Sequence, residues 1–288
     1  MLALTLRIAP WADSMNTLKN NIQKLLFVLV LGAAPLTGTL AQLAVPNGAG
    51  LTYGHVHLNV SDVELHKRLW VEYFGGVVVE KGPLTAIRLP NMLVALTEQA
   101  PTGGSMGTVM DHFGFKVRNM ADWLARWRAG GHAVDSEFTG AEGQPNAYVT
   151  LPDGVRVEMQ EDQSLPVEVS GYHIHFFTPQ FQDLMAWYMD IFALEQRPRG
   201  SILTTTNVPG MNLSFGNSRE PTLPTRGRAI DHIGFEVDNL EAFCNALLAR
   251  GVSFDVAYRE IPSIGLKIAF ITDPSGVFIE LTEGYDDF

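Results

Sequence analysis

The sequence predicts an α+β fold that consists of four copies of a βαβββ unit, grouped as two similar domains. Four segments, beginning at Tyr53, Val109, Gly171 and Ala229, each start with a short apolar strand that contains histidine and continue into an amphipathic helix. Short runs of β-forming residues follow each helix. The spacing from the strand histidine to the small residue at the helix end is 20, 19, 20 and 19 residues along the four units. The first unit therefore matches the third, and the second matches the fourth.

The remaining strands of each unit are expected in pairs that close the unit. They fall at residues 86–90 and 92–98, 147–151 and 155–160, 202–206 and 211–215, and 267–272 and 277–282. Segments rich in Gly, Pro, Ser and Thr separate the units at residues 99–108, 161–171 and 216–228. From this order we expect a first domain of two units at residues 52–160 and a second domain of two units at residues 171–284.

The N-terminal region is typical of a signal peptide at residues 1–41. Lys19 and Lys24 precede an apolar run at residues 25–40, and small residues before and at Ala41 suit cleavage there. Met15 also fits the start of such a signal, in which case residues 1–14 are an upstream extension. The alternative is an uncleaved membrane anchor. With cleavage, we expect a periplasmic or secreted protein with no stable membrane insertion.

Composition limits the partners of the chain. The formal net charge is −11, and no cluster of Lys and Arg is long enough to attract a phosphate backbone, so nucleic acid is not an expected partner. The only cysteine, Cys244, excludes an intramolecular disulfide and a thiolate metal site, and its apolar helix predicts a core position. We expect a small-molecule substrate, and both a monomer and a homodimer are compatible with the sequence.

The helices divide into residues expected in the core and residues expected at the surface. His66 and His132, on one helix and at the end of another, are expected at the surface. Helical spacing places four tryptophans in the core: Trp70, Trp123, Trp127 and Trp187.

Alternation along the first strand of each unit places histidine on the sheet face that points away from the helix. In the second unit Phe113, Phe115 and Val117 must face the helix, which leaves His112 and Gly114 on the opposite face. The same argument places His232 with Gly234 in the fourth unit. The pairs His55 with His57, and His173 with His175, lie on that face in the first and third units.

The closing strands of the second and fourth units add a carboxylate to this face. Glu158 and Glu280 each stand four residues after a turn glycine. Two histidines and one carboxylate on a concave sheet form a metal site with open positions for substrate. By domain, the expected ligand sets are His55, His112 and Glu158 in the first, and His173, His232 and Glu280 in the second. The metal would be divalent, with iron, manganese, nickel and zinc all open.

The second histidine of each His-x-His pair is expected beside the metal. His57 and His175 would act as hydrogen-bonding neighbours of the ligands, as acid or base, or as alternative ligands. The competing interpretation is that all of these histidines are hydrogen-bonded wall residues of a binding cup without a metal.

These motifs resemble the vicinal oxygen chelate superfamily, which includes glyoxalase I, extradiol dioxygenases, methylmalonyl-CoA epimerase and the bleomycin resistance proteins. The resemblance rests on GHVHLNV, DHFGFKV, YHIHFF, DHIGFEV and ITDPSGVFIEL, and covers residues 52–284. It implies that paired βαβββ units form a U-shaped sheet around a divalent metal, which vicinal oxygens of the substrate chelate. The ligand positions of the family correspond to the six residues of the two expected sets.

Two departures from the family pattern bear on activity. Glyoxalase I has a fourth ligand, a glutamate, at the positions that here hold Ala95 and Ser214. Extradiol dioxygenases have a tyrosine where this chain has Phe270, and a histidine for which residues 261–264 offer no counterpart. Neither activity is therefore implied without change.

Three functions follow from the residues and the resemblance. The first is a glyoxalase-like, metal-dependent lyase or isomerase that acts on a small oxygen-chelating substrate, with Glu158 or Glu280 serving as both ligand and base. The second is an Fe(II) dioxygenase of the extradiol type, which uses two histidines and a carboxylate. The third is a non-catalytic protein that binds a small ligand in the cups, like the bleomycin resistance proteins.

Overall fold

The computed structural model describes residues 43–285, which include all four predicted units. The expected signal peptide at residues 1–41 lies outside the described residues. Within residues 43–285, no helix is both long enough and apolar enough to cross a membrane.

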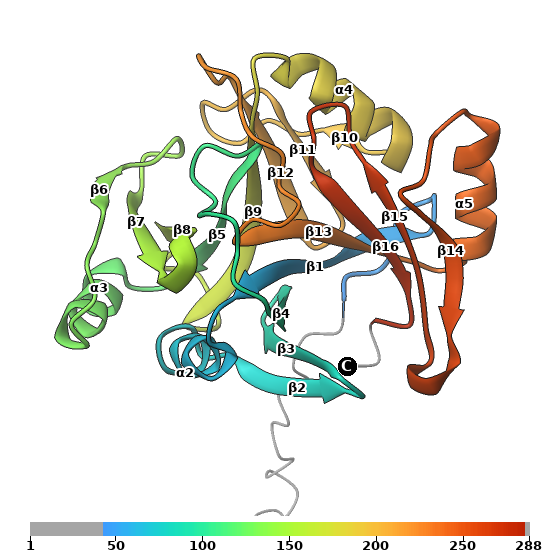
Figure 1. Cartoon of the computed structure of the whole chain (residues 1–288). Helices are drawn as coiled ribbons and strands as arrows, with labels where there is room; N and C mark the ends of the chain where they lie inside the picture. Colours follow the sequence, from blue (N-terminus) through green and yellow to red (C-terminus); the bar gives the residue numbers. More distant parts are fainter. Residues whose placement is uncertain (1–42, 286–288) are drawn as a thin grey trace, which may run out of the picture. The chain divides into compact units, whose positions relative to one another are not determined.

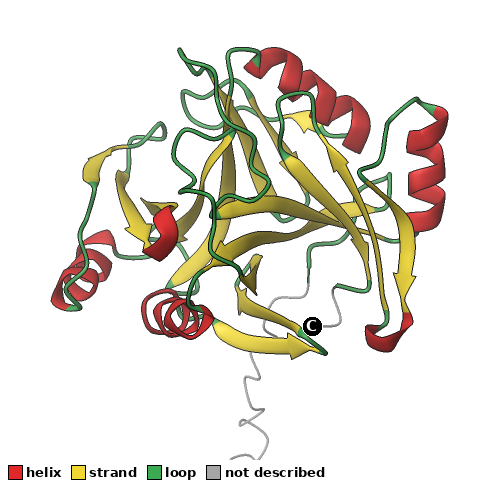
Figure 2. Ribbon diagram, in the orientation of Figure 1, coloured by secondary structure: helices red, strands yellow, loops and turns green. Residues whose placement is uncertain are grey.

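Each unit has the predicted βαβββ order. The first unit contains β1 (Leu51–Val60), α2 (Val63–Phe74), β2 (Val77–Lys81), β3 (Leu84–Leu89) and β4 (Met92–Glu98). The second unit contains β5 (Met110–Val117), α3 (Met120–Ala129), β6 (Ser136–Thr139), β7 (Pro145–Leu151), the short 3₁₀ helix η1 (Pro152–Gly154) and β8 (Val155–Glu161). The third unit contains β9 (Val169–Phe177), α4 (Phe181–Phe192), β10 (Glu195–Gln196), β11 (Thr205–Val208) and β12 (Met211–Gly216). The fourth unit contains β13 (Ile230–Val237), α5 (Leu240–Ala249), β14 (Val256–Ile261), the short 3₁₀ helix η2 (Pro262–Ile264), β15 (Leu266–Thr272) and β16 (Phe278–Glu283). The α+β class is confirmed (Figure 2).

Local signals explain where the helices begin. Three of them start after an Asp or Asn whose side chain accepts a hydrogen bond from the backbone N–H three residues later, which satisfies one of the unpaired donors of the first turn. The capping residues are Asp62 for α2, Asn119 for α3 and Asn239 for α5. Each of them follows the first strand of its unit after a turn.

The units combine into two eight-stranded sheets, but not in the expected pairs. One sheet has the order β14-β15-β16-β13-β1-β4-β3-β2 and joins the fourth unit to the first. The other has the order β10-β11-β12-β9-β5-β8-β7-β6 and joins the third unit to the second. Figure 1 shows β1 beside β13, although they lie far apart in the sequence. The prediction of one domain at residues 52–160 and another at 171–284, each with its own pair of units, is therefore wrong for the pairing.

The reason for the error is that the repeat does not determine which units pair. The first strand of every unit offers the same free edge, and neighbouring elements in the sequence pair in most but not all folds. Here β1 pairs antiparallel with β13, and β5 pairs antiparallel with β9. Each sheet thus takes one unit from each half of the chain.

The assignment of strand faces is confirmed by burial. Phe113, Phe115, Ile233 and Phe235 are fully buried and belong to one continuous apolar core. Three of the four predicted core tryptophans are also buried, whereas Trp187 is only partly buried against the core. Cys244 is buried, and burial raises the pKa of its thiol to about 11, which agrees with a core position.

His66 was expected at the surface, but its side chain is completely buried. Its Nε2 lies 3.4 Å from Asp153 Oδ2, and Asp153 also accepts hydrogen bonds from the backbone N–H and hydroxyl of Ser61. The start of α2 is therefore held against the turn before β8, which belongs to the other sheet. His132 is half-buried against the rings of Tyr73 and Trp127.

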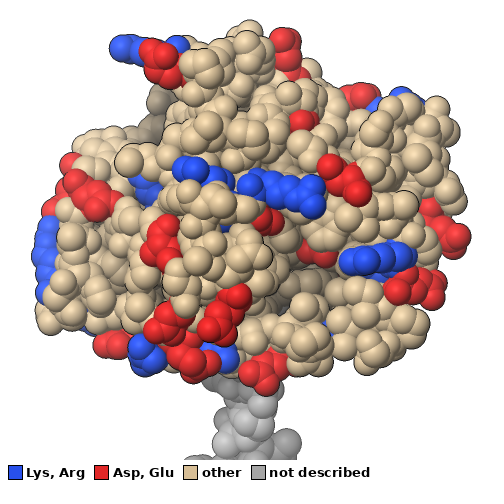
Figure 3. All heavy atoms as spheres, in the orientation of Figure 1, with Lys and Arg blue, Asp and Glu red and all other residues tan. Residues whose placement is uncertain are grey.

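Surface charge is mixed on the face seen in Figure 3. Lys and Arg side chains are interspersed with Asp and Glu across the described part of this face. Fields of opposite sign cancel over short distances at physiological ionic strength. This face therefore gives no reason to expect a large partner whose surface carries charge of a single sign.

Candidate metal centres

Two groups of four side chains could each hold a metal ion. The first, the β1/β13 centre, consists of His55, His57, His232 and Glu280, and the second, the β5/β9 centre, consists of His112, Glu158, His173 and His175. In each group the potential ligand atoms all lie within 4.8 Å of one another. All eight residues had been singled out in the sequence.

The grouping of these residues corrects the sequence prediction. His55 was expected with His112 and Glu158, and His173 with His232 and Glu280. Because β1 pairs with β13, His55 instead faces His232 and Glu280, and because β5 pairs with β9, His173 faces His112 and Glu158. The residue types were predicted, but each centre combines residues from both halves of the chain.

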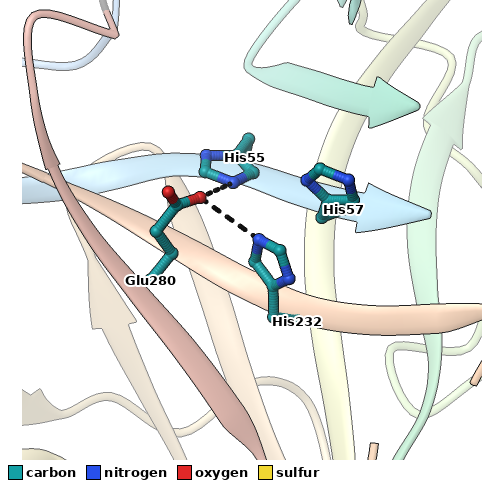
Figure 4. A group of neighbouring side chains, drawn as sticks. All are labelled: His55, His57, His232 and Glu280. Atoms are coloured by element: carbon teal, nitrogen blue, oxygen red, sulfur yellow. Dashed lines mark hydrogen bonds and ion pairs between the residues drawn. The ribbon is translucent and has the colours of Figure 1, made fainter. Parts of the chain in front are cut away.

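The β1/β13 centre is arranged around one carboxylate oxygen, as Figure 4 shows. Glu280 Oε2 lies 3.0 Å from His55 Nε2 and 3.2 Å from His232 Nε2. The His57 ring stacks on the His232 ring with 4.4 Å between centroids, and His57 Nε2 lies 2.7 Å from the Thr97 hydroxyl. Glu280 and His232 come from adjacent parallel strands, β16 and β13.

The β5/β9 centre repeats this geometry. Glu158 Oε2 lies 3.0 Å from His112 Nε2 and 3.1 Å from His173 Nε2. His175 Nδ1 is buried and makes no hydrogen bond within residues 43–285. Asn146 donates a hydrogen bond to the other oxygen of Glu158, and the Tyr148 hydroxyl lies 3.4 Å from Oε2.

Two aspartates next to the ligands were missed by the sequence reasoning. Asp231 Oδ1 lies 2.6 Å from His232 Nδ1, and Asp111 Oδ1 lies 2.8 Å from His112 Nδ1. Strict alternation would point an aspartate and the following histidine to opposite faces. However, the register of both strands shifts at the aspartate, and such a bulge redirects the side chain. In the sequence, the signal for these aspartates is the Asp-His pair that recurs in the first strand of the second and fourth units.

The aspartates fix the orientation of their histidines. A carboxylate that accepts the Nδ1 proton leaves Nε2 facing the centre, an arrangement found around many metal-bound histidines. Asp231 is itself held by the backbone N–H of Gly227 at 2.6 Å and by the Asn59 amide at 3.0 Å. Arg156 donates to Asp111 at 2.5 Å.

Burial and neighbouring charges divide the histidines into two classes. Burial disfavours the charged form of His232, but hydrogen bonds to Asp231 and Glu280 outweigh it and raise its pKa to about 9. The pKa of His112 is raised in the same way by Asp111 and Glu158. Burial lowers the pKa of His55, His57 and His175, and it lowers that of His173 to about 4.

The carboxylates are held in the ionised form. Burial alone would raise the pKa of Glu280, but hydrogen bonds to His232 and His55 lower it well below its usual range. Glu158 is affected in the same direction by His112 and His173. Near neutral pH each centre therefore presents one carboxylate, two neutral imidazoles, and one histidine, His232 or His112, whose pKa is raised by its carboxylate partners.

The residues present fit a divalent metal ion. Imidazole nitrogen and carboxylate oxygen are ligands of zinc, iron, nickel and manganese. In both centres the histidine nitrogens lie 3.0–3.2 Å from the shared carboxylate oxygen, close enough together for one ion to be held by all of them. The nitrogens that would bind the ion already converge on one carboxylate oxygen in each centre. They are Nε2 of His55 and His232 around Glu280 Oε2, and Nε2 of His112 and His173 around Glu158 Oε2.

The two centres differ in their surroundings. A cavity of about 400 Å³ adjoins the β1/β13 centre and is lined by His57, Ala95, Thr97 and Tyr285. Tyr148 beside Glu158 stands ten residues before it, as Phe270 stands ten residues before Glu280. The second unit therefore has a tyrosine at the position where the fourth unit has Phe270.

Paired βαβββ units with a donor set on each sheet define a class of small-molecule binding proteins and enzymes. The chain belongs to the Glyoxalase/Bleomycin resistance protein/Dioxygenase superfamily, whose family model matches residues 52–281. The resemblance inferred from the sequence motifs is thus confirmed. No curated protein sequence matches this chain.

Solved structures support the same fold. Glyoxalase I from Zea mays is similar over 82% of this chain and 94% of its own, with 16% identity and a TM-score of 0.63. A presumed dioxygenase from Bacillus subtilis is similar over 84% of this chain and 86% of its own, with 12% identity and a TM-score of 0.62. At these identities the similarity establishes the fold and not the activity.

Proposed function

We propose that this protein is a metal-dependent enzyme of the glyoxalase type, a lyase or isomerase that acts on a small oxygen-chelating substrate. The observation that carries the proposal is the pair of matched groups, each with three histidines and one glutamate around a single point. Membership of the superfamily supports the same class of chemistry. Repetition of the full donor set on both sheets argues against chance clustering of wall histidines.

The residues that would hold the ion are His55, His232 and Glu280 in one centre and His173, His112 and Glu158 in the other. His57 and His175 are placed to supply a fourth donor. They lie in register with Ala95 and Ser214, small residues at the positions where glyoxalase I has a glutamate. The space left by the missing carboxylate is thus next to an imidazole.

The bound ion would supply polarisation of a substrate carbonyl and a fixed position for two substrate oxygens. Proton transfer falls to the protein. Glu280 and Glu158 are ionised near neutral pH, and each can accept a proton from a substrate carbon next to the carbonyl. His57 lies half-buried at the edge of the 400 Å³ cavity, and because burial lowers its pKa it is placed to hydrogen-bond the substrate as a neutral imidazole.

A second candidate function is oxygenation at the β5/β9 centre. It is favoured by the facial set of two histidines and one carboxylate and by the Tyr148 hydroxyl, which lies 3.4 Å from Glu158. The β1/β13 centre has Phe270 at the corresponding position. This candidate predicts oxygen uptake with iron-loaded protein and a catechol, and it predicts loss of that uptake in Tyr148→Phe.

We also propose that the chain is exported, on the pattern of residues 1–41. N-terminal sequencing of the protein recovered from outside the cytoplasm should begin near residue 42. Recovery of the protein only from the cytoplasm, with residues 1–41 intact, would refute export.

Deuterium exchange tests the proposed function without knowledge of the natural substrate. Protein loaded with zinc, nickel, manganese or iron is incubated with hydroxyacetone in D₂O, and exchange of the carbon-bound protons next to the carbonyl is followed by NMR. We expect exchange that depends on metal and is lost in the Glu158→Gln, Glu280→Gln double variant. If the double variant shows the same exchange as the wild type, or if the wild type does not retain metal, the protein would instead be a non-catalytic protein that binds a small ligand.

A further inference from the structure

A buried arginine lies beside the β5/β9 centre, and no carboxylate of residues 43–285 pairs with it. Arg199, in the loop between β10 and β11, is 8% exposed. It donates hydrogen bonds from Nη1 to Gln160 Oε1 at 3.0 Å and from Nη2 to Ser214 Oγ at 3.3 Å. Its Nε is buried without a hydrogen bond within residues 43–285, and no carboxylate of these residues lies within 4.0 Å of its nitrogens.

The contacts of Arg199 place it next to the ligand histidines. Its guanidinium lies 5.1 Å from the centre of the Tyr172 ring, and that ring lies 5.6 Å from the His173 ring. Ser214 is in register with His175 on the adjacent strand. Gln160 follows Glu158 by two residues on β8 and therefore shares its sheet face.

The nearby carboxylates are engaged elsewhere. Glu142 accepts hydrogen bonds from the Gln160 amide and from the Tyr172 hydroxyl, the latter at 3.3 Å. Glu158 faces the histidines of the centre. A buried guanidinium with neutral hydrogen-bond partners is costly, and an anionic ligand would relieve this cost. A divalent ion at the same centre would add to the demand for negative charge.

A contrast between the two centres supports a ligand role. Arg199 and Tyr172 also line a cavity of about 840 Å³ that none of the four donors of the centre lines, so this cavity is an approach to the guanidinium and not to the metal donors. In the β1/β13 centre, Ala95 and Thr282 hold the positions of Ser214 and Gln160. Ala95 has no hydrogen-bond acceptor in its side chain, and the Thr282 hydroxyl is engaged with the Phe235 carbonyl and Glu236. The two centres therefore present different walls to a substrate.

We propose that Arg199 forms a carboxylate-binding subsite of the β5/β9 centre, which therefore takes a small chelating acid with a second, distal carboxylate. The chemical class is a 2-oxo or 2-hydroxy diacid, with one end on the metal donors and the other on the guanidinium. Gln160 and Ser214 orient the guanidinium plane, whose paired N–H groups match a carboxylate. This inference rests on the proposed metal-dependent function.

Two matched probes separate the subsite from the metal centre. 2-Oxoglutarate and 2-oxopentanoate share the same chelating end, but only the first has a distal carboxylate. Binding of each to zinc-loaded Glu280→Gln protein, in which only the β5/β9 centre is intact, is measured by calorimetry. We expect 2-oxoglutarate to bind about 10-fold or more tightly than 2-oxopentanoate, as for a charge-assisted hydrogen bond.

Variants of two neighbouring arginines supply the control. Arg199→Gln should remove the preference and leave the affinity for 2-oxopentanoate unchanged, whereas Arg199→Lys should retain part of it. Arg197→Gln, which changes an exposed arginine of the same loop, should retain all of it. In Glu158→Gln protein, where only the β1/β13 centre is intact, the preference should be absent. This last comparison does not depend on the folding of Arg199 variants.

The outcomes distinguish the two proposals. Equal affinity for both acids at the β5/β9 centre, or equal weakening of both by Arg199→Gln, overturns the subsite while metal-dependent binding stands. If zinc is not retained, or neither acid binds, the proposed function fails and the subsite fails with it.

Discussion

The pKa of His232 depends on a pair of carboxylates that clamp its ring from both sides. Asp231 contacts Nδ1 and Glu280 contacts Nε2, so the metal-free protein favours the imidazolium. A metal ion requires the neutral ring, because Nε2 must donate its lone pair. Metal binding and proton release are therefore coupled at this residue.

At pH 7.5, which lies below the folded-state pKa of about 9, His232 carries a proton that a metal ion must displace. We expect zinc binding to the β1/β13 centre to release about one proton, as measured by calorimetry in buffers of different ionisation enthalpy. Asp231→Asn removes a group that raises this pKa, so release should decrease, and zinc affinity should fall about 10–100-fold. Unchanged proton release in Asp231→Asn would contradict the role of Asp231. Thr272→Ala, at the exposed last residue of β15 in the same sheet, is a control.

Residue types at the centres were predictable from the sequence, because alternation fixes which side chains share a face. Phe113 and Phe115 had to face the core, and His112 and Glu158 were thereby placed on the other face. Asp111 and Asp231 were not predictable, because a bulge breaks the alternation on which the argument relied. Arg199 could not be placed either, since loop residues carry no periodicity.

At the scale of the strand, a glycine makes room for one ligand histidine in each centre. Gly234 lies opposite His55 on β13, and a Cβ at this position would lie 2.1 Å from the His55 ring. Gly114 lies opposite His173 on β5, and a Cβ there would also lie 2.1 Å from the ring. Such distances are far inside van der Waals contact, so the ring would have to move.

Gly234→Ala should therefore displace His55 and abolish tight metal binding at the β1/β13 centre alone, at a cost of about 1–3 kcal/mol in stability. Gly114→Ala should do the same at the β5/β9 centre. Metal content and urea unfolding of each variant provide the measurement. Gly48→Ala is the matched control, because a Cβ there meets nothing within 4 Å. Retention of full metal content by Gly234→Ala would show that the His55 position is not required.

At the scale of the whole molecule, each centre draws on both halves of the chain. The repeat predicted four units and their internal order, but strand pairing between units depends on long-range packing that a repeat does not record. One such contact is the buried His66 beside Asp153, which joins the first helix to a turn of the other sheet. Because the first unit pairs with the fourth and the second with the third, neither half of the chain contains a complete metal centre by itself.

Metal content of double variants tests this arrangement and the metal proposal together. We would load the protein with zinc, remove free metal and measure zinc per chain. The account predicts two ions in the wild type, one for each donor group, and one in Glu280→Gln or Glu158→Gln. His55→Ala with Glu280→Gln should still bind one, because both changes affect the same centre, whereas His55→Ala with Glu158→Gln should bind none. The reverse result for the two double variants, or no zinc in the wild type, would contradict the account.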